Sequence, residues 1–377
     1  MPAAPPLISV VIPVYDVAGY LDGCLDAILR QGDGGLEVIA VDDASPDESG
    51  AILDARAARD QRLHVLHMAR NTGPGGARNA GLSRAAGEYV WFVDADDLVA
   101  DGALAAIAER VTAVRPDLLL VDYESLYPDG TSEPSPGRAE FRRSGGRVLT
   151  LADRPGLIHL TMTSWSKVIR RAFLGGLGLR FPPGIHEDVL LSATLLLEAG
   201  RIALLDRVCY RYRRERPGSF MATPGDSHLA IFRSYEQVFA LVEDRLSGAD
   251  PSVAGPVRAA VFERAIWHYA SILEAGRTGR PGHGLLPSGG LVPPGERRRF
   301  FERMHEDFIR YRPEAYRHPK GARGAKLRLV ERGAFRAYCL LEPVNQARLR
   351  ARAAAGARWP AAAGEDKLPA GGAERPG

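Results

Sequence analysis

The chain has 377 residues, 45% of them hydrophobic and 25% charged, which is typical of a folded protein with one large domain and an accessory region. A net charge of +3 is too small to indicate nucleic-acid binding, and three widely spaced cysteines argue against a disulfide framework and favour a reducing compartment. The N-terminal residues lack the pattern of a signal peptide, and no run of about 18 uncharged apolar residues occurs, so we expect a cytoplasmic protein.

The first 125 residues alternate strand and helix patterns, as a parallel α/β sheet does. Apolar, β-branched runs predict strands at residues 7–14, 36–41, 63–68, 88–93 and 117–121. Helical spacing predicts helices at residues 21–29, 76–86 and 103–114, and Ser45-Pro46-Asp47 should open a further helix with proline in its first turn.

The rest of the chain is less regular. Residues 128–146 are rich in Pro, Gly and Ser and predict a loop, whereas residues 189–199 are apolar on all sides and predict a buried helix. Residues 227–274 have a helical pattern with Tyr235, Phe239 and Trp267 as candidate core residues. A linker is expected at residues 276–295. Residues 297–352 carry 16 Lys or Arg against 6 Asp or Glu.

Polar residues follow three of the predicted strands. In a parallel α/β sheet, ligands bind outside the carboxyl ends of the strands. Tyr15 and Asp16 follow the first strand, Asp42-Asp43 the second, and Asp94-Ala95-Asp96-Asp97 the fourth. A single acidic strand end is usually a solvated loop, but three at one edge of a sheet indicate a binding site.

Asp94 and Asp96 are separated by one residue. On a turn that leaves a strand, this spacing lets two carboxylates face one point, which suits a hard divalent cation with oxygen ligands. Mn²⁺ or Mg²⁺ commonly binds through one or two carboxylates plus phosphate oxygens, so a nucleoside diphosphate would complete the shell. The cation would offset charge on a departing diphosphate. Asp97 is expected only to cap the next segment.

In this context the sequence resembles the family 2 glycosyltransferases, and the resemblance covers residues 7–220 with motifs in the family's order. The segments that carry it are residues 8–15 (ISVVIPVY), 41–47 (VDDASPD), 71–81 (NTGPGGARNAG) and 93–97 (VDADD), then Trp165, Lys167, Phe181, Glu187-Asp188 and residues 210–213 (YRYR). The resemblance implies a GT-A fold, a Rossmann-like and mostly parallel sheet with flanking helices.

The resemblance also implies the role of each residue on the donor side. Tyr15 would pack against the base, Pro13 would belong to the nucleotide-sugar-binding residues, and Asp43 would accept a hydrogen bond from a pyrimidine ring nitrogen. Asp94 would contact the ribose and the metal shell, and Asp96 would ligate the cation. Arg78 would lie near the nucleotide, although a solvated helix arginine is an equally good interpretation of it.

The acceptor hydroxyl needs a proton acceptor, because an alcohol is a poor nucleophile at neutral pH. Glu187-Asp188 resembles the family's Glu-Asp pair at the start of a helix, so we expect Asp188 to be the base and Glu187 an acceptor-binding or orienting residue. A base that acts in one displacement implies inversion at the anomeric carbon. Lys167, Arg211 and Arg213 are candidates for neutralising the diphosphate or a charged acceptor.

The basic C-terminal region contains a helical stripe of apolar residues, Leu327, Val330, Ala334, Tyr338 and Leu341. A basic amphipathic helix can rest on an anionic membrane, and it can equally pack its stripe on the catalytic domain. The region is also similar to tails of actinobacterial transferases of cell-wall polymers. The charge is not interleaved with an aromatic platform, so nucleic acid is not an expected partner.

The expected organisation has three parts. A catalytic domain spans residues 1–225, with a nucleotide-sugar half at 7–125 and an acceptor half at 126–225. A helical accessory region follows at 226–352, basic after 297, and residues 353–377 form a disordered tail. The expected function is inverting transfer of a sugar from a UDP-linked donor to a hydroxyl of a glycan, lipid-linked or cell-wall polymer acceptor, with peripheral contact at the inner face of the membrane.

Two other classes of protein stay open at this point. A sugar-nucleotide nucleotidyltransferase also combines α/β topology with carboxylate-bound metal, but its glycine-rich loop should follow the first strand, where this chain has Pro-Val-Tyr-Asp. A non-catalytic nucleotide- or carbohydrate-binding module would have no need of a base, so the pair at 187–188 argues against it.

Overall fold

The computed structural model describes residues 5–31, 35–160, 162–184, 186–214, 226–275 and 291–341. Its strands are β1 (Ile8–Val14), β2 (Leu36–Asp42), β3 (Leu63–His67), β4 (Tyr89–Phe92), β5 (Leu98–Val99), β6 (Leu118–Leu126), β7 (Ser132–Pro134), β8 (Val148–Leu149), β9 (Lys167–Arg170) and β10 (Ile202–Arg213). Its helices are α1 (Ala18–Leu29), α2 (Ser49–Ala57), α3 (Gly73–Arg84), α4 (Ala103–Val114), α5 (Arg138–Arg143), α6 (Arg171–Gly176), α7 (Glu187–Glu198), α8 (Ala230–Arg245), α9 (Pro251–Glu274), α10 (Arg297–Tyr311) and α11 (Gly321–Glu331).

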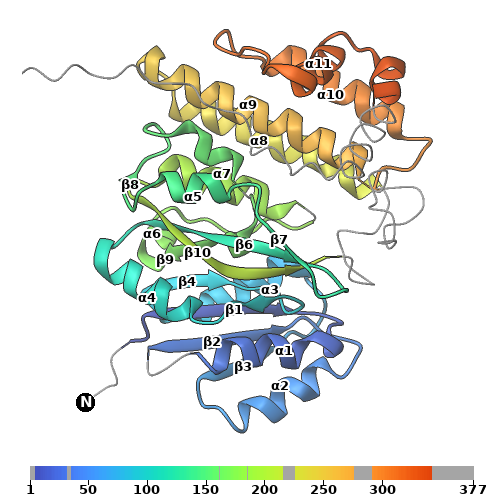
Figure 1. The fold of residues 1–377 in the computed structure, drawn as a ribbon. Coiled ribbons are helices and arrows are strands. Elements are labelled where there is room, and N and C mark those ends of the chain that lie inside the picture. Colours follow the sequence, from blue (N-terminus) through green and yellow to red (C-terminus); the bar gives the residue numbers. More distant parts are fainter. Residues whose placement is uncertain are drawn as a thin grey trace, which may run out of the picture.

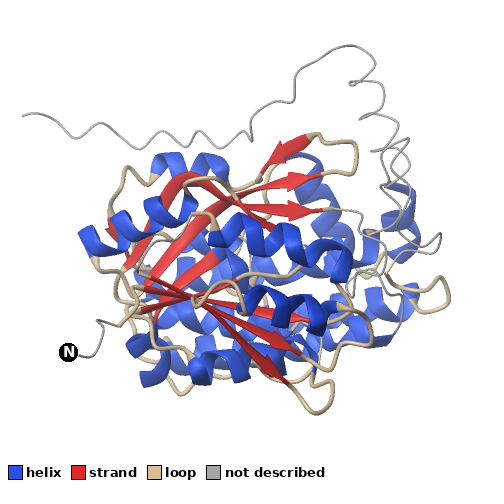
Figure 2. Ribbon diagram, turned by 90° about the horizontal axis from the view of Figure 1, so that it is seen from below, coloured by secondary structure: helices blue, strands red, loops and turns tan. Residues whose placement is uncertain are grey.

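The elements are stacked in layers (Figure 1). β1–β3 with α1 and α2 lie at one end, and the sheet continues through β4, β9, β6 and β10 towards the other. α7 lies between this sheet and the long helices α8 and α9, and α10 and α11 are outermost. Figure 2 shows the strands fanning out as a twisted sheet with helices on both sides.

The strand order is β3-β2-β1-β4-β9-β6-β10-β5. β1 pairs in parallel with β2 and β4, as expected for the nucleotide-sugar half. β9, however, runs antiparallel to both β4 and β6. The fold class is therefore α/β as expected, but the sheet is mixed rather than mostly parallel. The sequence did not predict β9, because its four residues begin and end with a cation and form no extended apolar run.

Each face of the sheet packs against its own core. Alternate residues of a strand point to opposite faces, so Val11 of β1 enters one core while Val10 and Ile12 enter the other. All three are completely buried, which explains why this strand is a continuous apolar run.

One of these cores continues into the C-terminal helices. It holds Tyr235 of α8, Phe262 of α9 and Phe300 of α10 together with residues of α7 and of the sheet. The candidate core residue Phe239 is buried as expected, but Trp267 is only half-buried, and the Arg323 guanidinium lies 4.6 Å from the centre of its ring.

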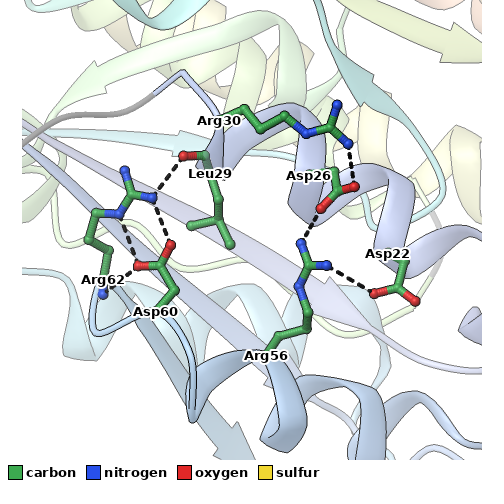
Figure 3. Close-up of polar contacts among 7 residues, drawn as sticks. All are labelled: Asp22, Asp26, Leu29, Arg30, Arg56, Asp60 and Arg62. Atoms are coloured by element: carbon green, nitrogen blue, oxygen red, sulfur yellow. Dashed lines mark hydrogen bonds and ion pairs between the residues drawn. The ribbon is translucent and has the colours of Figure 1, made fainter.

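Ion pairs join α1 to α2 on the surface (Figure 3). Arg56 of α2 reaches both Asp26 and Asp22 of α1, the latter at 3.5 Å. Arg62 donates to the Leu29 carbonyl at 2.8 Å and so ties the start of β3 to the end of α1. Exposed ion pairs of this kind each contribute about 0–1 kcal/mol, so they orient the two helices more than they stabilise the fold.

Two local predictions were wrong. α2 begins at Ser49 rather than at Ser45-Pro46-Asp47, because the Asp47 carboxylate instead accepts hydrogen bonds from the backbone N–H groups of Ala18 and Ser49. The stretch 128–146, expected to be a loop, contains β7 and α5. A buried phenylalanine in α5, Phe141, packs that helix against the core.

The apolar stripe of the C-terminal region is covered by protein. Leu327, Val330 and Tyr338 are buried in the core that also holds α9 and α10, so the stripe packs on the accessory helices rather than on the catalytic domain. Of the linker expected at 276–295, residues 276–290 lie outside the described residues, and so does the expected disordered tail at 353–377. In the part of the chain that the structure describes, none of the helices combines the length and apolar character needed to cross a bilayer.

Candidate functional site

Three polar strand ends meet at one edge of the sheet. Because β2 and β4 both pair in parallel with β1, the carboxyl ends of the three strands point the same way. Tyr15 follows β1, Asp43 follows β2, and Asp94 comes shortly after β4. The structure therefore brings together the three segments that the sequence placed at a common edge.

Asp43 is the most firmly held residue of the donor side. It is 1% exposed, and its carboxylate accepts hydrogen bonds from Thr72 N at 2.9 and 3.0 Å and from Thr72 Oγ1 at 2.8 Å. Its backbone N donates to Val14 O at 2.9 Å, which holds it beside the end of β1. Pro13 lies half-buried within β1, and the Tyr15 side chain is 46% exposed. A planar base stacked on Tyr15 would lie beside a rigid carboxylate.

The acidic turn has a divided role. Asp94 and Asp96 are half-buried, whereas Asp97 is buried. Asp97 was expected to cap the following segment, but its carboxylate is used elsewhere. Its carboxylate accepts hydrogen bonds from Tyr210 Oη at 2.6 Å and from Arg213 N at 2.7 Å, and so fastens the turn to β10. Burial raises the pKa of Asp97 well above its usual range.

The turn fits a divalent cation that is shared with phosphate. Within the described residues, no group of three or more His, Cys, Asp or Glu side chains is arranged to hold a metal ion. Mg²⁺ does not need such a cage, because it commonly binds through one or two carboxylates, water and substrate phosphates. Asp94 is half-buried and its Oδ1 accepts a hydrogen bond from Arg78 at 2.8 Å, so this carboxylate is held in place at the turn.

Arg78 connects the acidic turn to α7. Its Nη2 donates to Asp94, and its Nη1 donates to Glu187 Oε1 at 2.5 Å. The side chain is 6% exposed, and its guanidinium lies 5.4 Å from the centre of the Phe181 ring. Burial alone would lower the pKa of Arg78, but the charges of Asp94 and Glu187 outweigh it and raise the pKa. Arg78 is therefore not a solvated helix arginine.

Glu187 and Asp188 are the first residues of α7, and they differ in burial and in their charged partners. Glu187 is buried and bound to Arg78, which makes it an orienting residue. Asp188 is half-buried. Burial and the charge of Glu187 raise the pKa of Asp188 to about 7, although Arg78 and Lys167 lower it. The charge of Asp94 also raises this pKa. Arg78 donates to both Asp94 and Glu187, so it holds the start of α7 close to the acidic turn.

The three candidate cations do not lie together. Lys167 is fully buried in β9, and its Nζ donates to Thr163 O at 2.9 Å and to Ser166 Oγ at 3.1 Å. Arg211 pairs with Glu124 at 2.8 Å. Arg213 binds the acidic turn through its backbone N, and its guanidinium lies 5.6 Å from the ring centre of Tyr20. Lys167 is thus the cation near Asp188, and Arg213 is the one beside the acidic turn.

A stack of aromatic rings lies next to the acidic turn. The rings of Trp165 and Tyr210 are stacked with centres 4.4 Å apart, and Trp91 Nε1 donates to Trp165 O at 2.7 Å. Tyr210 also accepts a hydrogen bond from Asp94 N at 3.2 Å. The sequence indicated Trp165 and Tyr210 only as parts of motifs. In the sequence, aromatic and basic residues alternate at 210–213, and this alternation indicates a strand with one apolar and one polar face.

Comparison with known proteins gives related sequences along much of the chain. A family model described as "Glycosyl transferase family 2" matches residues 9–174. The chain is 31% identical to "Glycosyltransferase GlyG" of Streptococcus pneumoniae over 262 residues, which cover 66% of this chain and 83% of that protein. It is 32% identical to "Uncharacterized glycosyltransferase EpsJ" of Bacillus subtilis over 227 residues, 58% of this chain and 64% of that protein.

The fold is similar to that of a solved structure. The crystal structure of Staphylococcus aureus TarS residues 1–349 in complex with UDP-GlcNAc matches with a TM-score of 0.64 and 22% identity, covering 90% of this chain and 91% of that one. This likeness confirms the GT-A-type α/β fold with a helical C-terminal region. By sequence the chain matches only 37% of full-length TarS, a poly(ribitol-phosphate) β-N-acetylglucosaminyltransferase, so it spans less than two thirds of both EpsJ and TarS.

Proposed function

The chain belongs to glycosyl transferase family 2, and on this premise we propose that it transfers a sugar, with inversion, from a UDP-linked donor to a hydroxyl group of a glycan, lipid-linked or cell-wall polymer acceptor. The family and the glycosyltransferase class expected from the sequence are confirmed. The family assignment also sets aside the nucleotidyltransferase alternative. The observation that carries the proposal is the Arg78 bridge, which holds the acidic turn and the Glu187-Asp188 pair around one point.

The donor would bind at the edge formed by β1, β2 and β4. Its base would stack on Tyr15 beside Pro13 and reach the Asp43 carboxylate. Asp94 and Asp96 would hold the diphosphate end through Mn²⁺ or Mg²⁺, whose positive charge would stabilise the departing nucleoside diphosphate. Arg78 would act on the donor through Asp94, because its guanidinium is already committed to two carboxylates.

Asp188 would act as the general base in a single displacement. It takes the proton from the acceptor hydroxyl while that oxygen forms a bond to the anomeric carbon. The bond between the anomeric carbon and the diphosphate oxygen breaks, and its electron pair leaves with the diphosphate. Attack from the side opposite the leaving group inverts the anomeric centre. A carboxyl group with a pKa near 7 suits this role, since half of it is ionised near neutral pH. A non-catalytic module would have no use for such a residue.

The nature of the acceptor rests on the relatives. TarS is named for transfer to poly(ribitol phosphate), and TarS was solved with UDP-GlcNAc. We extend these chemistries to this chain as a proposal. The proposed arrangement keeps the catalytic domain at 1–225 and the accessory region at 226–352, in a cytoplasmic protein that contacts the inner face of the membrane peripherally.

Membrane contact would use charge, because Leu327, Val330 and Tyr338 of the apolar stripe are buried. Arg328 of α11 is exposed, as are Arg332 and Arg336, which follow the end of that helix. Each basic residue near an anionic surface contributes about 1 kcal/mol to binding. Replacing all three with Gln should therefore reduce co-sedimentation with phosphatidylglycerol vesicles, and unchanged co-sedimentation would rule out this surface.

A donor screen tests the central proposal. The full chain is incubated with UDP-, GDP- and dTDP-linked sugars, and release of nucleoside diphosphate is measured with Mn²⁺ and with chelator. We expect Mn²⁺-dependent release from a UDP-sugar and far less release by Asp188→Asn. Release that is equal in chelator, or equal in Asp188→Asn, would contradict the assigned roles.

A further inference from the structure

His67, the last residue of β3, lies between two carboxylates close to the donor side of the sheet. Its Nδ1 is 3.0 Å from Asp42 Oδ2, and its Nε2 is 3.0 Å from Asp54 Oδ1. Asp42 ends β2, where it pairs in register with His67, and Asp54 belongs to α2. The three elements lie together at one end of the molecule (Figure 1). We call His67 with its two carboxylates the His67 bridge.

The His67 bridge is complete only when the imidazole carries its second proton. An ionised carboxylate accepts hydrogen bonds but donates none, and a neutral imidazole has a single N–H. Hydrogen bonds to Asp42 and to Asp54 raise the pKa of His67 above its usual range, although burial opposes the rise. Burial would raise the pKa of Asp42, but hydrogen bonds from Ser45 and His67 outweigh it and lower this pKa. An imidazolium between two carboxylates therefore satisfies all three groups.

The Asp42 carboxylate also holds the turn that carries Asp43. Oδ1 of Asp42, the oxygen that does not face His67, accepts a hydrogen bond from Ser45 N at 3.0 Å. The main-chain carbonyl of Asp42 accepts another from Met68 N at 2.8 Å. Asp43, the residue assigned to the donor base, lies inside the turn that the Asp42–Ser45 hydrogen bond closes. One carboxylate thus connects His67 to the base-reading residue.

This turn depends on such outside contacts. Ala44 has a left-handed backbone with φ of 58°, a conformation that is uncommon for residues other than glycine and persists where surrounding contacts hold it. A Cβ on Gly50 of α2 would lie 3.0 Å from Asp42 Oδ2 and 3.6 Å from His67 Cε1. The Asp42 carboxylate is therefore held by the Ser45 amide, by His67 and by close packing against α2.

Solvent reaches the His67 bridge. The side chains of His67 and Asp54 are 46% and 66% exposed, whereas that of Asp42 is 10% exposed. The charge of His67 can therefore follow the pH of the solution. Exposed ion pairs contribute little to stability, so we expect loss of this charge to leave the fold intact and to act on the Asp42 turn.

We propose that protonated His67 is a positioning residue of the donor site, which holds Asp42 and thereby fixes the turn that places Asp43 against the donor base. The inference rests on the proposed function, in which the base reaches Asp43. A group whose pKa is raised in the folded chain contributes at low pH and loses its contribution as the pH rises through the raised value. Donor affinity should therefore decrease towards alkaline pH. This effect on binding is separate from the dependence that Asp188 gives to the rate at saturating donor.

The test is a calorimetric titration of the full chain with UDP and Mn²⁺ between pH 6 and pH 8.5. The protonation of UDP itself affects every variant equally, so the measured quantity is the dissociation constant of His67→Gln divided by that of the unmodified chain. We expect this ratio to be roughly three- to ten-fold at pH 6, because a hydrogen-bonded charge is lost at a partly exposed position. At pH 8.5 the ratio should approach one, because the unmodified imidazole is then neutral.

Two further variants separate titration from packing. Asp54→Asn changes an exposed side chain and removes one charge that raises the pKa of His67, so UDP affinity should begin to fall at a lower pH. A purely structural role of His67 would give no such displacement. His64→Gln, which replaces an exposed histidine on the same strand, is the matched control and should bind UDP like the unmodified chain at every pH.

A direct titration of the imidazole needs no change at His67. If protonation favours the donor, then UDP must in turn raise the pKa of His67, since linkage is reciprocal. The imidazole resonances are followed by NMR across the same pH range with and without UDP and Mn²⁺. That of His67 is identified as the resonance whose titration Asp54→Asn moves to lower pH.

The outcomes distinguish this inference from the proposed function. A ratio for His67→Gln that is equal at pH 6 and pH 8.5, a His67 pKa that UDP does not raise, or the same effect from His64→Gln would each overturn the inference and leave the proposed function in place. Absence of UDP binding at every pH would overturn the proposed function, and the role of His67 with it.

Discussion

Arg78 on α3 donates to Glu187 at the start of α7, with 2.5 Å between Nη1 and Oε1, although 109 residues separate them in the sequence. The same guanidinium donates to Asp94 at 2.8 Å. A single buried side chain thus sets the spacing between the turn assigned to the donor and the helix that carries the assigned base. Because Asp188 follows Glu187 directly, its position depends on this contact as well.

Replacing Arg78 with Ala should destabilise the protein strongly. Removing one partner of a buried ion pair leaves an uncompensated charge on Glu187 and typically costs about 3–5 kcal/mol. Denaturant unfolding measures the loss, with Arg84→Ala, an exposed change on the same helix, as a control expected within about 0.5 kcal/mol of the unmodified chain. Adding Glu187→Leu to Arg78→Met should recover part of the stability. An unfolding free energy unaffected by Arg78→Ala would show that the pair does not hold the site together.

Asp188→Asn should abolish transfer without affecting the donor. Loss of a general base typically lowers the rate by about 10²–10⁴-fold, and the amide preserves the shape of the side chain. Steady-state transfer and UDP binding are measured in parallel. Asp206→Asn, an exposed change on β10, should leave both unchanged. Full transfer by Asp188→Asn would mean that another residue is the base.

The rate of transfer should rise with pH up to about neutrality and then stay constant. The base must be ionised to accept a proton, and the pKa of Asp188 is raised to about 7 by burial and by Glu187. The rate should therefore fall about ten-fold for each pH unit below 7 and level off above it. Lys167→Met removes a charge that lowers this pKa, so the pH below which the rate falls should become higher. A flat profile between pH 5.5 and 8 would contradict the assignment.

Asp96→Ala should weaken Mn²⁺-dependent UDP binding by at least about ten-fold while leaving the melting temperature nearly unchanged. The carboxylate is half-buried on a turn, and its assigned task is to hold a cation rather than the fold. Calorimetry with Mn²⁺ and with chelator measures the effect, and Asp101→Ala, an exposed acid shortly after the turn, is the control. Equal UDP affinity with and without Mn²⁺ in the unmodified chain would remove the metal from the proposal.

Tyr210→Phe should destabilise the acidic turn. It removes the hydrogen bond to the buried Asp97 carboxylate and the one accepted from Asp94 N, and a buried polar group left without a partner costs about 1–3 kcal/mol. Tyr212→Phe, on the same strand, is the matched comparison, because its ring also stacks on Trp165. Equal effects of the two changes on unfolding would show that packing, not the hydroxyl of Tyr210, anchors the turn.

Much of the fold follows from local patterns. β1, β2 and β4 are buried on both faces, so they are continuous apolar runs, and α4 covers the predicted residues 103–114. β9 and α5 were not predicted because each is too short to establish a period, and β9 begins and ends with a cation rather than forming an extended apolar run. The start of α2 was misplaced because Asp47 bonds to α1, a contact that no local pattern contains.

The sequence by itself determined the acidic segments Asp43, Asp94–Asp97 and Glu187-Asp188, their order, and their place at strand or helix ends, because strand and helix periods and turn residues are local properties. The tertiary structure alone decided which acids are available for chemistry. Asp97 and Glu187 are bound to Tyr210 and Arg78, whereas Asp188 has a raised pKa beside Lys167. Burial and charge partners depend on residues a hundred positions away, and only the folded chain brings those residues into contact.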